Sequence, residues 1–248
     1  DQPIDSHYIS MATEFSDFKR KDTQKFTGSF VNREDYESRT QEQVVWIQDA
    51  WTPKDAVTLT SGLRFEHATL KSDQQQQSET ALLPSLAVRG QPNDAWVLRS
   101  SLGAGMKMPK INEISNTSSR SFAINTPLDA DQRGNPNLKP ERSINFEAVA
   151  ERYLANKKGV MAANIYVRST QDFIERRVQE ESGRWVDRPY NEGDAMHWGL
   201  ELDGKVATDD WAWQGGTLKS HLTLPKARVD DARLGITRMA RDTPKYVW

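Results

Sequence analysis

One stretch decides the fold: from Val57 to Glu66 the chain reads Val-Thr-Leu-Thr-Ser-Gly-Leu-Arg-Phe-Glu. Its apolar residues fall on one parity, and polar residues or glycine occupy the other; the apolar set is Val57, Leu59, Leu63 and Phe65. Successive side chains of a β-strand point to opposite faces, so this alternation predicts a strand with one apolar and one polar face. No stretch shows a convincing helical spacing of three and four.

The same alternation recurs along the whole chain, for example around Ile144, from Trp96 to Met106 and from Met161 to Val167. It predicts about ten strands, with boundary errors of about two to four residues. The predicted strands cover residues 6–18, 43–51, 57–70, 81–90, 95–106, 143–153, 160–172, 194–207, 212–224 and 244–248.

The connections between these strands alternate between short and long. The short ones, rich in Pro, Asn, Asp, Gly or charge, are 52–56, 91–94, 154–159 and 208–210. The long polar ones are 19–42, 71–80, 107–142, 173–193 and 225–243. Short turns at one end of a sheet and long loops at the other are typical of an antiparallel transmembrane β-barrel, which has short periplasmic turns and long external loops.

The composition agrees with such a barrel. Of 248 residues only 36% are hydrophobic and 27% are charged, and a barrel needs apolar side chains only on its outward band. The formal net charge of −2 gives no electrostatic footprint for nucleic acid, and the absence of cysteine excludes disulfides and thiolate chemistry. Tryptophans lie next to the short turns, where an aromatic girdle is expected; they are Trp51, Trp96, Trp211 and Trp213.

Several segments resemble the barrel of TonB-dependent outer-membrane receptors. The most specific is 134–143, Gly-Asn-Pro-Asn-Leu-Lys-Pro-Glu-Arg-Ser, which is similar to the family segment Asn-Pro-x-Leu-x-Pro-Glu entering a strand. The hairpin 46–66, the strand 103–113 and the segment 191–202 also resemble family strands, in family order. Pro136 and Pro140 stiffen this re-entry into the sheet, and Glu141 and Arg142 are expected at the barrel rim, either paired with neighbouring strands or solvated.

The resemblance implies an all-β fold: about ten strands of a larger barrel of the 22-strand type, whose lumen is closed by a plug. Residues 1–248 would be part of one outer-membrane β-barrel domain, with the plug domain absent from this stretch. The implied function is TonB-dependent uptake of a scarce nutrient, foremost a ferric siderophore or other metal chelate, with cobalamin and oligosaccharides as further possibilities. The implied partners are outer-membrane lipid, the small-molecule or metal-chelate ligand, and TonB through the missing plug region. The implied location is the outer membrane of a Gram-negative bacterium.

Two other readings stay open at this stage. One is a non-gated structural or adhesive outer-membrane barrel whose long loops bind a surface partner. The other is a soluble β-sandwich that acts as a binding module for a sugar or peptide. Ten strands could also close by themselves as a small barrel.

Neither catalysis nor a cofactor is expected. The four histidines are scattered, and no nucleophile elbow or phosphate-binding loop occurs, so no catalytic or metal residue is predicted. Asp129, Asp131, Asp230 and Asp231 are more simply solvated loop acids than cation ligands. The ligand-binding candidates face the predicted lumen or lie in the longest loop; they are Arg64, Arg99, Lys107, Arg120, Phe122, Asn145, Tyr166 and Arg168. For any one lumenal residue, packing against a plug is the competing role.

Overall fold

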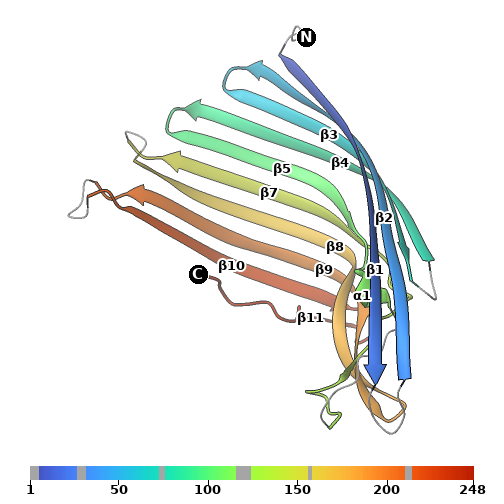
Figure 1. Ribbon diagram of the computed structural model, residues 1–248. Helices are drawn as coiled ribbons and strands as arrows, with labels where there is room; N and C mark the ends of the chain where they lie inside the picture. The colour runs from blue at the N-terminus through green and yellow to red at the C-terminus, as the bar shows by residue number, and fades with distance from the viewer. Residues whose placement is uncertain (1–5, 27–31, 73–75, 116–123, 156–157, 210–213) are drawn as a thin grey trace.

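The computed structural model describes residues 6–26, 32–72, 76–115, 124–155, 158–209 and 214–248. These form one curved, open sheet whose strands follow chain order, apart from β6, which pairs with β9 (Figure 1). The strands are β1 (His7–Phe26), β2 (Asn32–Lys54), β3 (Val57–Lys71), β4 (Gln76–Asn93), β5 (Trp96–Lys107), β6 (Asp131–Gln132), β7 (Glu141–Tyr153), β8 (Gly159–Glu181), β9 (Arg184–Ala207), β10 (Thr217–Asp231) and β11 (Ile236–Met239). The prediction of an antiparallel β-barrel wall is confirmed.

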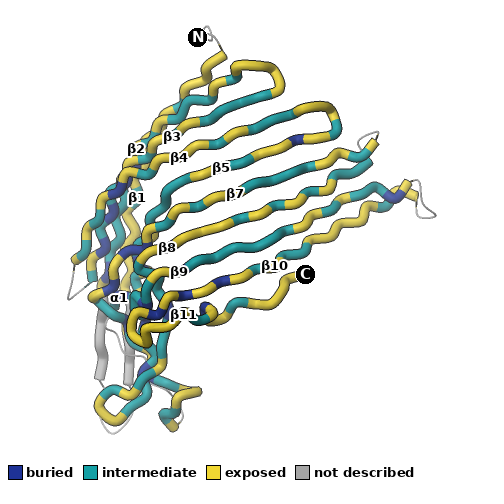
Figure 2. The backbone as a smooth tube through the Cα atoms, turned by 180° about the vertical axis from the view of Figure 1, so that it is seen from behind, coloured by how far each residue is buried: buried dark blue, intermediate teal, exposed yellow. Residues whose placement is uncertain are grey.

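Both faces of the sheet follow the parity read from the sequence. Leu102 on β5 pairs with Phe146 on β7, and both side chains are exposed on the convex face, at 50% and 40%. Their neighbours Ser101 and Glu147 pair on the concave face. The exposed apolar row continues over every long strand, so the sheet has no apolar core beneath its middle (Figure 2).

The sandwich alternative is therefore wrong, because the described strands form one sheet whose apolar row faces outward. Among the described residues, the buried apolar clusters lie toward the long-loop end of the sheet. One joins Ala195, Ala227, Val229 and Ala240, and the other joins Leu70, Ile114 and Leu138. Among the residues that the structure describes, no helix is both long and apolar enough to cross a membrane.

The short-turn end of the sheet is as predicted. Lys54 pairs with Val57 across the β2–β3 turn, and Asn93 pairs with Trp96 across the β4–β5 turn. Trp51 and Trp96 lie on the convex face next to these turns, where Trp51 stacks on His7 with ring centroids 5.7 Å apart. Trp211 and Trp213, also predicted for the girdle, lie outside the described residues.

The long-loop end differs from the prediction in detail. Residues 19–26 and 32–42, predicted as loop, continue the β1–β2 ladder, and residues 173–193 form a hairpin that turns at Ser182 and Gly183. Backbone hydrogen bonds hold these hairpins together, and charged residues such as Glu175 and Glu192 are buried among the strand positions of the second one. The apolar alternation on which the strand prediction depended is therefore lost there.

The last predicted strand was also misplaced. Residues 225–243 are not a loop: β10 runs to Asp231, turns at once and returns as β11. Residues 244–248 are not a strand, and touch the sheet through a single bridge between Thr223 and Val247.

The connection between β5 and β7 is the one long irregular segment among the described residues, and it carries a helix that the sequence did not predict. This short helix, α1 (Ile111–Ile114), buries Ile114 against Leu70 and Leu138. Further along this connection, the two residues of β6 pair in parallel with Val186 and Asp187 on β9. Segments far apart in sequence thus meet at the long-loop end.

Candidate functional site

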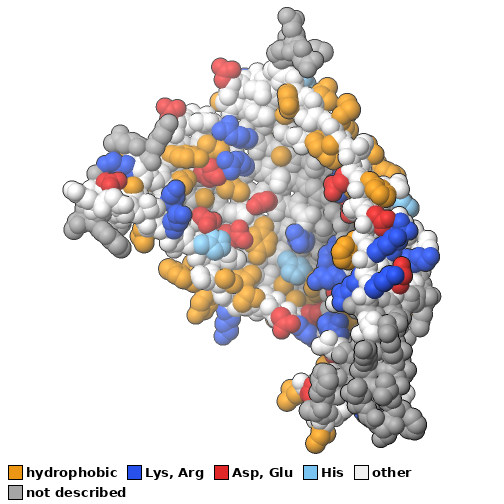
Figure 3. Space-filling model, viewed as in Figure 1, with side chains coloured by type: hydrophobic (Ala, Val, Ile, Leu, Met, Phe, Trp, Pro, Cys, Tyr) orange, Lys and Arg blue, Asp and Glu red, His pale blue; other side chains and the backbone are white. Residues whose placement is uncertain are grey.

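Charged and polar side chains gather on the concave face of the sheet. Figure 3 looks into this face and shows Lys and Arg, Asp and Glu, and histidine side chains spread over its surface. The register explains the gathering, because cross-strand partners point to the same side: Asn145 pairs with Arg168, and Glu147 pairs with Tyr166.

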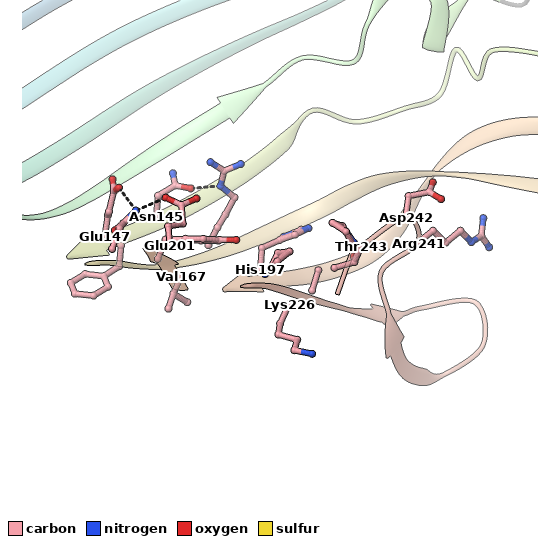
Figure 4. A pocket seen from close by; sticks show the side chains of 16 residues that line it. Asn145, Glu147, Val167, His197, Glu201, Lys226, Arg241, Asp242 and Thr243 are labelled. Carbon is pink, nitrogen blue, oxygen red and sulfur yellow. Dashed lines mark hydrogen bonds between the residues drawn. The ribbon is translucent and has the colours of Figure 1, made fainter. Parts of the chain in front are cut away.

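A polar hollow on β7–β10 has a volume of about 580 Å³. Asn145, Tyr166, Arg168 and His197 line it from three adjacent strands, and residues 241–244 close it from the side (Figure 4). Of the sequence-predicted ligand residues, the structure thus brings together Asn145, Tyr166 and Arg168.

Hydrogen bonds fix most of the polar wall of this hollow. Arg168 donates through Nε to Asn145 Oδ1 at 2.6 Å. Asn164 Nδ2 donates both to Glu147 Oε1 at 2.8 Å and to Glu201 Oε2 at 2.9 Å (Figure 4). Two carboxylates thus share one amide group. Their remaining oxygens leave acceptor capacity for a further donor.

Two buried polar atoms of this hollow have no hydrogen-bond partner within the described chain: Asn164 Oδ1 and His197 Nδ1. The His197 ring meets Phe173 edge-on, with centroids 5.2 Å apart. Buried polar atoms are normally satisfied. These two are therefore points where a bound group would gain a hydrogen bond.

A bulge between β11 and the chain end forms the side of the hollow. Arg228 pairs with Met239, and the next bridge joins Thr223 to Val247. Seven residues (240–246) therefore lie opposite four (224–227). The backbone N–H of Arg241 donates to Glu175 Oε1 at 2.6 Å, and Asp242 has a φ of 56°. Bulges of this kind re-aim side chains toward sites, here toward the hollow.

The other predicted cations are paired within the wall. Arg64 lies 3.2 Å from Glu66, Arg99 donates to both carboxylate oxygens of Glu151, and Lys107 donates to Glu141 at 2.9 Å. The pairs of Arg99 and Lys107 join β5 to β7, whereas the Arg64–Glu66 pair lies within β3. None of the three cations lines the hollow. Arg120 and Phe122 lie outside the described residues.

Several lining residues were missed by the sequence analysis. Glu201 and His197 share the concave parity with Lys205, and extending the alternation along β9 would have found them. Arg241 and Asp242 carry no such signal, because the bulge interrupts the period of two.

The segment 134–143 docks at the long-loop end through backbone contacts. Gln77 Nε2 donates to the carbonyls of Pro136 at 3.0 Å and Leu138 at 2.7 Å. A Cβ on Gly134 would lie 2.0 Å from the carbonyl oxygen of Ser115, so only glycine fits there. Arg142 pairs with Glu79 at 3.0 Å, so the rim pairs of the motif are formed.

Two of the four loop acids considered as cation ligands, Asp131 and Asp231, are bound by arginines instead. Asp131 is 1% exposed and is held by Arg184 at 2.6 and 2.8 Å, and Asp231, also 1% exposed, is held by Arg238 at 2.8 Å. These two acids form buried ion pairs, so the expectation of solvated acids is wrong for them, whereas Asp129 and Asp230 are exposed as expected. Within the described ranges, no group of three His, Asp or Glu residues could hold a metal ion.

Comparison with known proteins gives one family and many structures of the same fold. The family model "TonB dependent receptor-like, beta-barrel" matches residues 5–246. The copper transporter OprC superposes with a TM-score of 0.73 at 14% identity, over 95% of this chain and 36% of that one. The ferric citrate transporter FecA in its unliganded form gives 0.71 at 14% identity, over 97% and 35%. The ferric yersiniabactin uptake receptor FyuA from Yersinia pestis gives 0.66 at 16%, over 97% and 36%.

The chain therefore spans about a third of the length of these solved structures, whose names describe transporters and receptors. A search of the curated proteins gives no match.

Proposed function

Because the chain belongs to the TonB-dependent receptor-like β-barrel family, we propose that it forms part of the wall of a receptor that takes up a scarce nutrient. TonB-dependent receptors are outer-membrane proteins of Gram-negative bacteria, and this chain is proposed to lie there as part of one barrel domain. The strands β1 and β11 at the two ends of the sheet would then join further strands of the same barrel.

The observation that carries the proposal is the separation of the two faces. On the convex face, Leu102, Ile144 and Ile165 are at least half exposed, at 50%, 61% and 51%. In water such a belt would be a severe aggregation liability, whereas in a bilayer it is the required surface. The concave face is polar, which suits a lumen that holds water, a plug and a passing solute.

The proposed ligand class is a ferric siderophore or another metal chelate. The similar structures are named for iron, ferric chelates and copper. Arg168 supports an anionic ligand, because its only hydrogen bond in the described chain is from Nε to Asn145 and its two Nη groups remain available. His197 and the bulge residues would complete such a contact in the hollow.

The proposed protein partner is TonB, reached through a plug domain. Glu147 and Glu201, which share the amide of Asn164, offer acceptors to donors of a plug packed against this wall. Arg64 and Arg99 are already neutralised by wall carboxylates, so they are less suited to that contact.

Uptake measurements on the complete receptor test the proposal. Cells carrying or lacking the full gene would be given radioactive iron as ferric citrate, as a ferric catecholate or as a ferric hydroxamate. Gene-dependent accumulation of one chelate that disappears without TonB is expected. Accumulation or adhesion that does not need TonB would instead support a non-gated or adhesive barrel.

A pair of variants connects the uptake to the hollow. Arg168→Gln should lower uptake of the transported chelate several-fold, since a charge-assisted contact is worth roughly 1.5–3 kcal/mol. Lys54→Gln, at the β2–β3 turn, should leave uptake unchanged. Equal uptake by both variants would remove Arg168 from the ligand path.

A further inference from the structure

Two pairs of like charges face each other at the short-turn end of the concave face. Arg89 on β4 is the direct cross-strand partner of Arg99 on β5. Lys205 on β9 is the direct partner of Lys219 on β10. Like charges directly opposite each other on one face destabilise a sheet. Negative charge placed near two such pairs would relieve the repulsion within each of them.

The wall itself compensates only one of these four cations. Arg99 donates to Glu151 Oε1 at 2.6 Å and to Oε2 at 3.2 Å. Arg89 donates to Gln91 Oε1 at 2.8 Å, which is a neutral acceptor. Along the described strands and turns, no carboxylate forms an ion pair with Arg89, Lys205 or Lys219.

These cations surround open space rather than packed protein. Arg89 and Lys205 line one hollow of about 610 Å³, although three strands separate β4 from β9 in the sheet. Lys205 and Lys219 line an adjoining hollow of about 410 Å³. Two acids share these hollows: Asp94 lines the first, and Asp203, which is hydrogen-bonded to His221 at 2.7 Å, lines the second. Among the described residues, neither forms an ion pair with Arg89, Lys205 or Lys219, and Lys158 adds a further cation to the first hollow.

We propose that these hollows hold an acidic segment of polypeptide that lies in the lumen at the short-turn end. The cations are spread over β4, β9 and β10, so an extended chain with several carboxylates matches them better than one small anion does. The proposal relies on the proposed function only for turning this face toward a lumen. Its test measures stability rather than uptake, so the two can fail separately.

The direction in which Lys205→Gln shifts the unfolding temperature of the complete receptor distinguishes an occupied site from an empty one. If an acidic segment neutralises Lys205, Lys205→Gln removes an attraction and should lower the unfolding temperature by about 2 °C or more. If nothing acidic is present, the same change relieves the repulsion from Lys219 and should raise that temperature. A rise would overturn the proposal.

Further variants separate charge from side-chain shape. Lys219→Gln should lower the unfolding temperature as Lys205→Gln does, whereas Lys205→Arg should keep the wild-type value. Lys54→Gln, at the same end but opposite the neutral Val57, should also be silent. A loss of stability in Lys205→Arg as large as in Lys205→Gln would contradict a charge contact.

A final experiment tests whether a small free anion occupies the site instead of an acidic polypeptide segment. The purified receptor, dialysed free of multivalent anions, would be heated with and without millimolar inorganic phosphate. Under the proposal the wild-type unfolding temperature is unchanged by phosphate, because the acidic segment already occupies the site. Stabilisation of the wild type by phosphate, absent from Lys205→Gln, would replace the peptide by a free anion and overturn the proposal.

Discussion

The side chain of Asn191 makes both backbone hydrogen bonds of Lys139. Its Oδ1 accepts from the Lys139 N–H at 2.9 Å, and its Nδ2 donates to the Lys139 carbonyl at 3.0 Å. The same Nδ2 also donates to the Asp172 carbonyl at 2.6 Å. The side-chain amide of Asn191 on β9 thus makes the two hydrogen bonds that the backbone of a neighbouring strand would otherwise make to Lys139.

Asn191→Ala should therefore release this segment without unfolding the sheet. Three hydrogen bonds are lost, and a cost of about 1–3 kcal/mol is expected for the local docking. Limited proteolysis of the receptor should show faster cleavage within residues 134–140. Asn137→Ala is the matched control, because the Asn137 side chain is exposed and makes no hydrogen bond within the described chain. Equal cleavage of both variants would contradict the role of Asn191.

Charges on adjacent residues of β5 should have opposite consequences for membrane assembly. Leu102 faces outward and Ser101 faces the concave side, opposite Glu147. Leu102→Arg should cost about 2–4 kcal/mol in the bilayer midplane and reduce the amount of folded receptor in outer-membrane fractions. Ser101→Arg should assemble normally. Similar losses for the two would refute the assignment of faces.

Tyr166 and Gly199 form a tight cross-strand contact that should not tolerate a methyl group. A Cβ on Gly199 would lie 2.6 Å from the Tyr166 hydroxyl oxygen and 2.7 Å from its ring carbon Cζ. Gly199→Ala should destabilise the barrel by about 1–3 kcal/mol through overpacking, measured as a lower unfolding temperature.

Combining Gly199→Ala with Tyr166→Ser tests the cause. If the clash is with the ring, the double variant should be less destabilised than the sum of the single changes. Additive losses would place the cost in the backbone of β9 instead.

The β10–β11 turn should resist mild acid. Hydrogen bonding from Arg238 is the main cause that lowers the pKa of Asp231 below its ordinary value, and the Leu234 N–H contributes further. A carboxyl whose pKa is lowered on folding stabilises the fold fully above the unfolded pKa of about 3.9, and the contribution is lost as pH falls through the lower folded value.

The protection of residues 231–236 against hydrogen exchange, taken relative to the intrinsic exchange rate at each pH, should therefore stay constant from neutral pH down to about pH 4 and fall only below it. Asp231→Asn should exchange quickly already at neutral pH, because it leaves Arg238 with one carboxylate fewer. Opening of the wild-type turn near pH 6 would show that another group controls it.

The part of the sheet with an apolar convex face could be predicted from the sequence because the same alternation of apolar and polar residues runs along every strand there. Leu59, Ile144 and Ile165 all lie on the convex face and alternate with polar residues, so their spacing reveals the strands. The hairpin 173–193 obeys no such constraint. Its strands depend on backbone pairing and on ion pairs such as Arg177 with Glu192 at 3.0 Å, which leave no regular pattern.

The candidate site was predictable to the extent that it lies on regular strands. Asn145, Tyr166 and Arg168 follow from parity alone. Parity does not predict which concave cations are neutralised by a carboxylate. Arg99 pairs with Glu151, fifty-two positions away in sequence, because the strand register brings the two side chains together. The bulge that brings Arg241 to the hollow depends on how residues 240–246 skip pairing, and side-chain type does not encode that.

The pairing of β6 with β9 also sets a chronology for assembly. Nearly all other strand pairs join neighbours in the chain, so they can form as each hairpin arrives. The β5–β7 connection instead attaches to residues 184–191 through Asp131, Asn135 and Lys139. The β5–β7 connection can make these contacts only after β9 has joined the sheet. Its docking is therefore a late step in the assembly of this part of the wall.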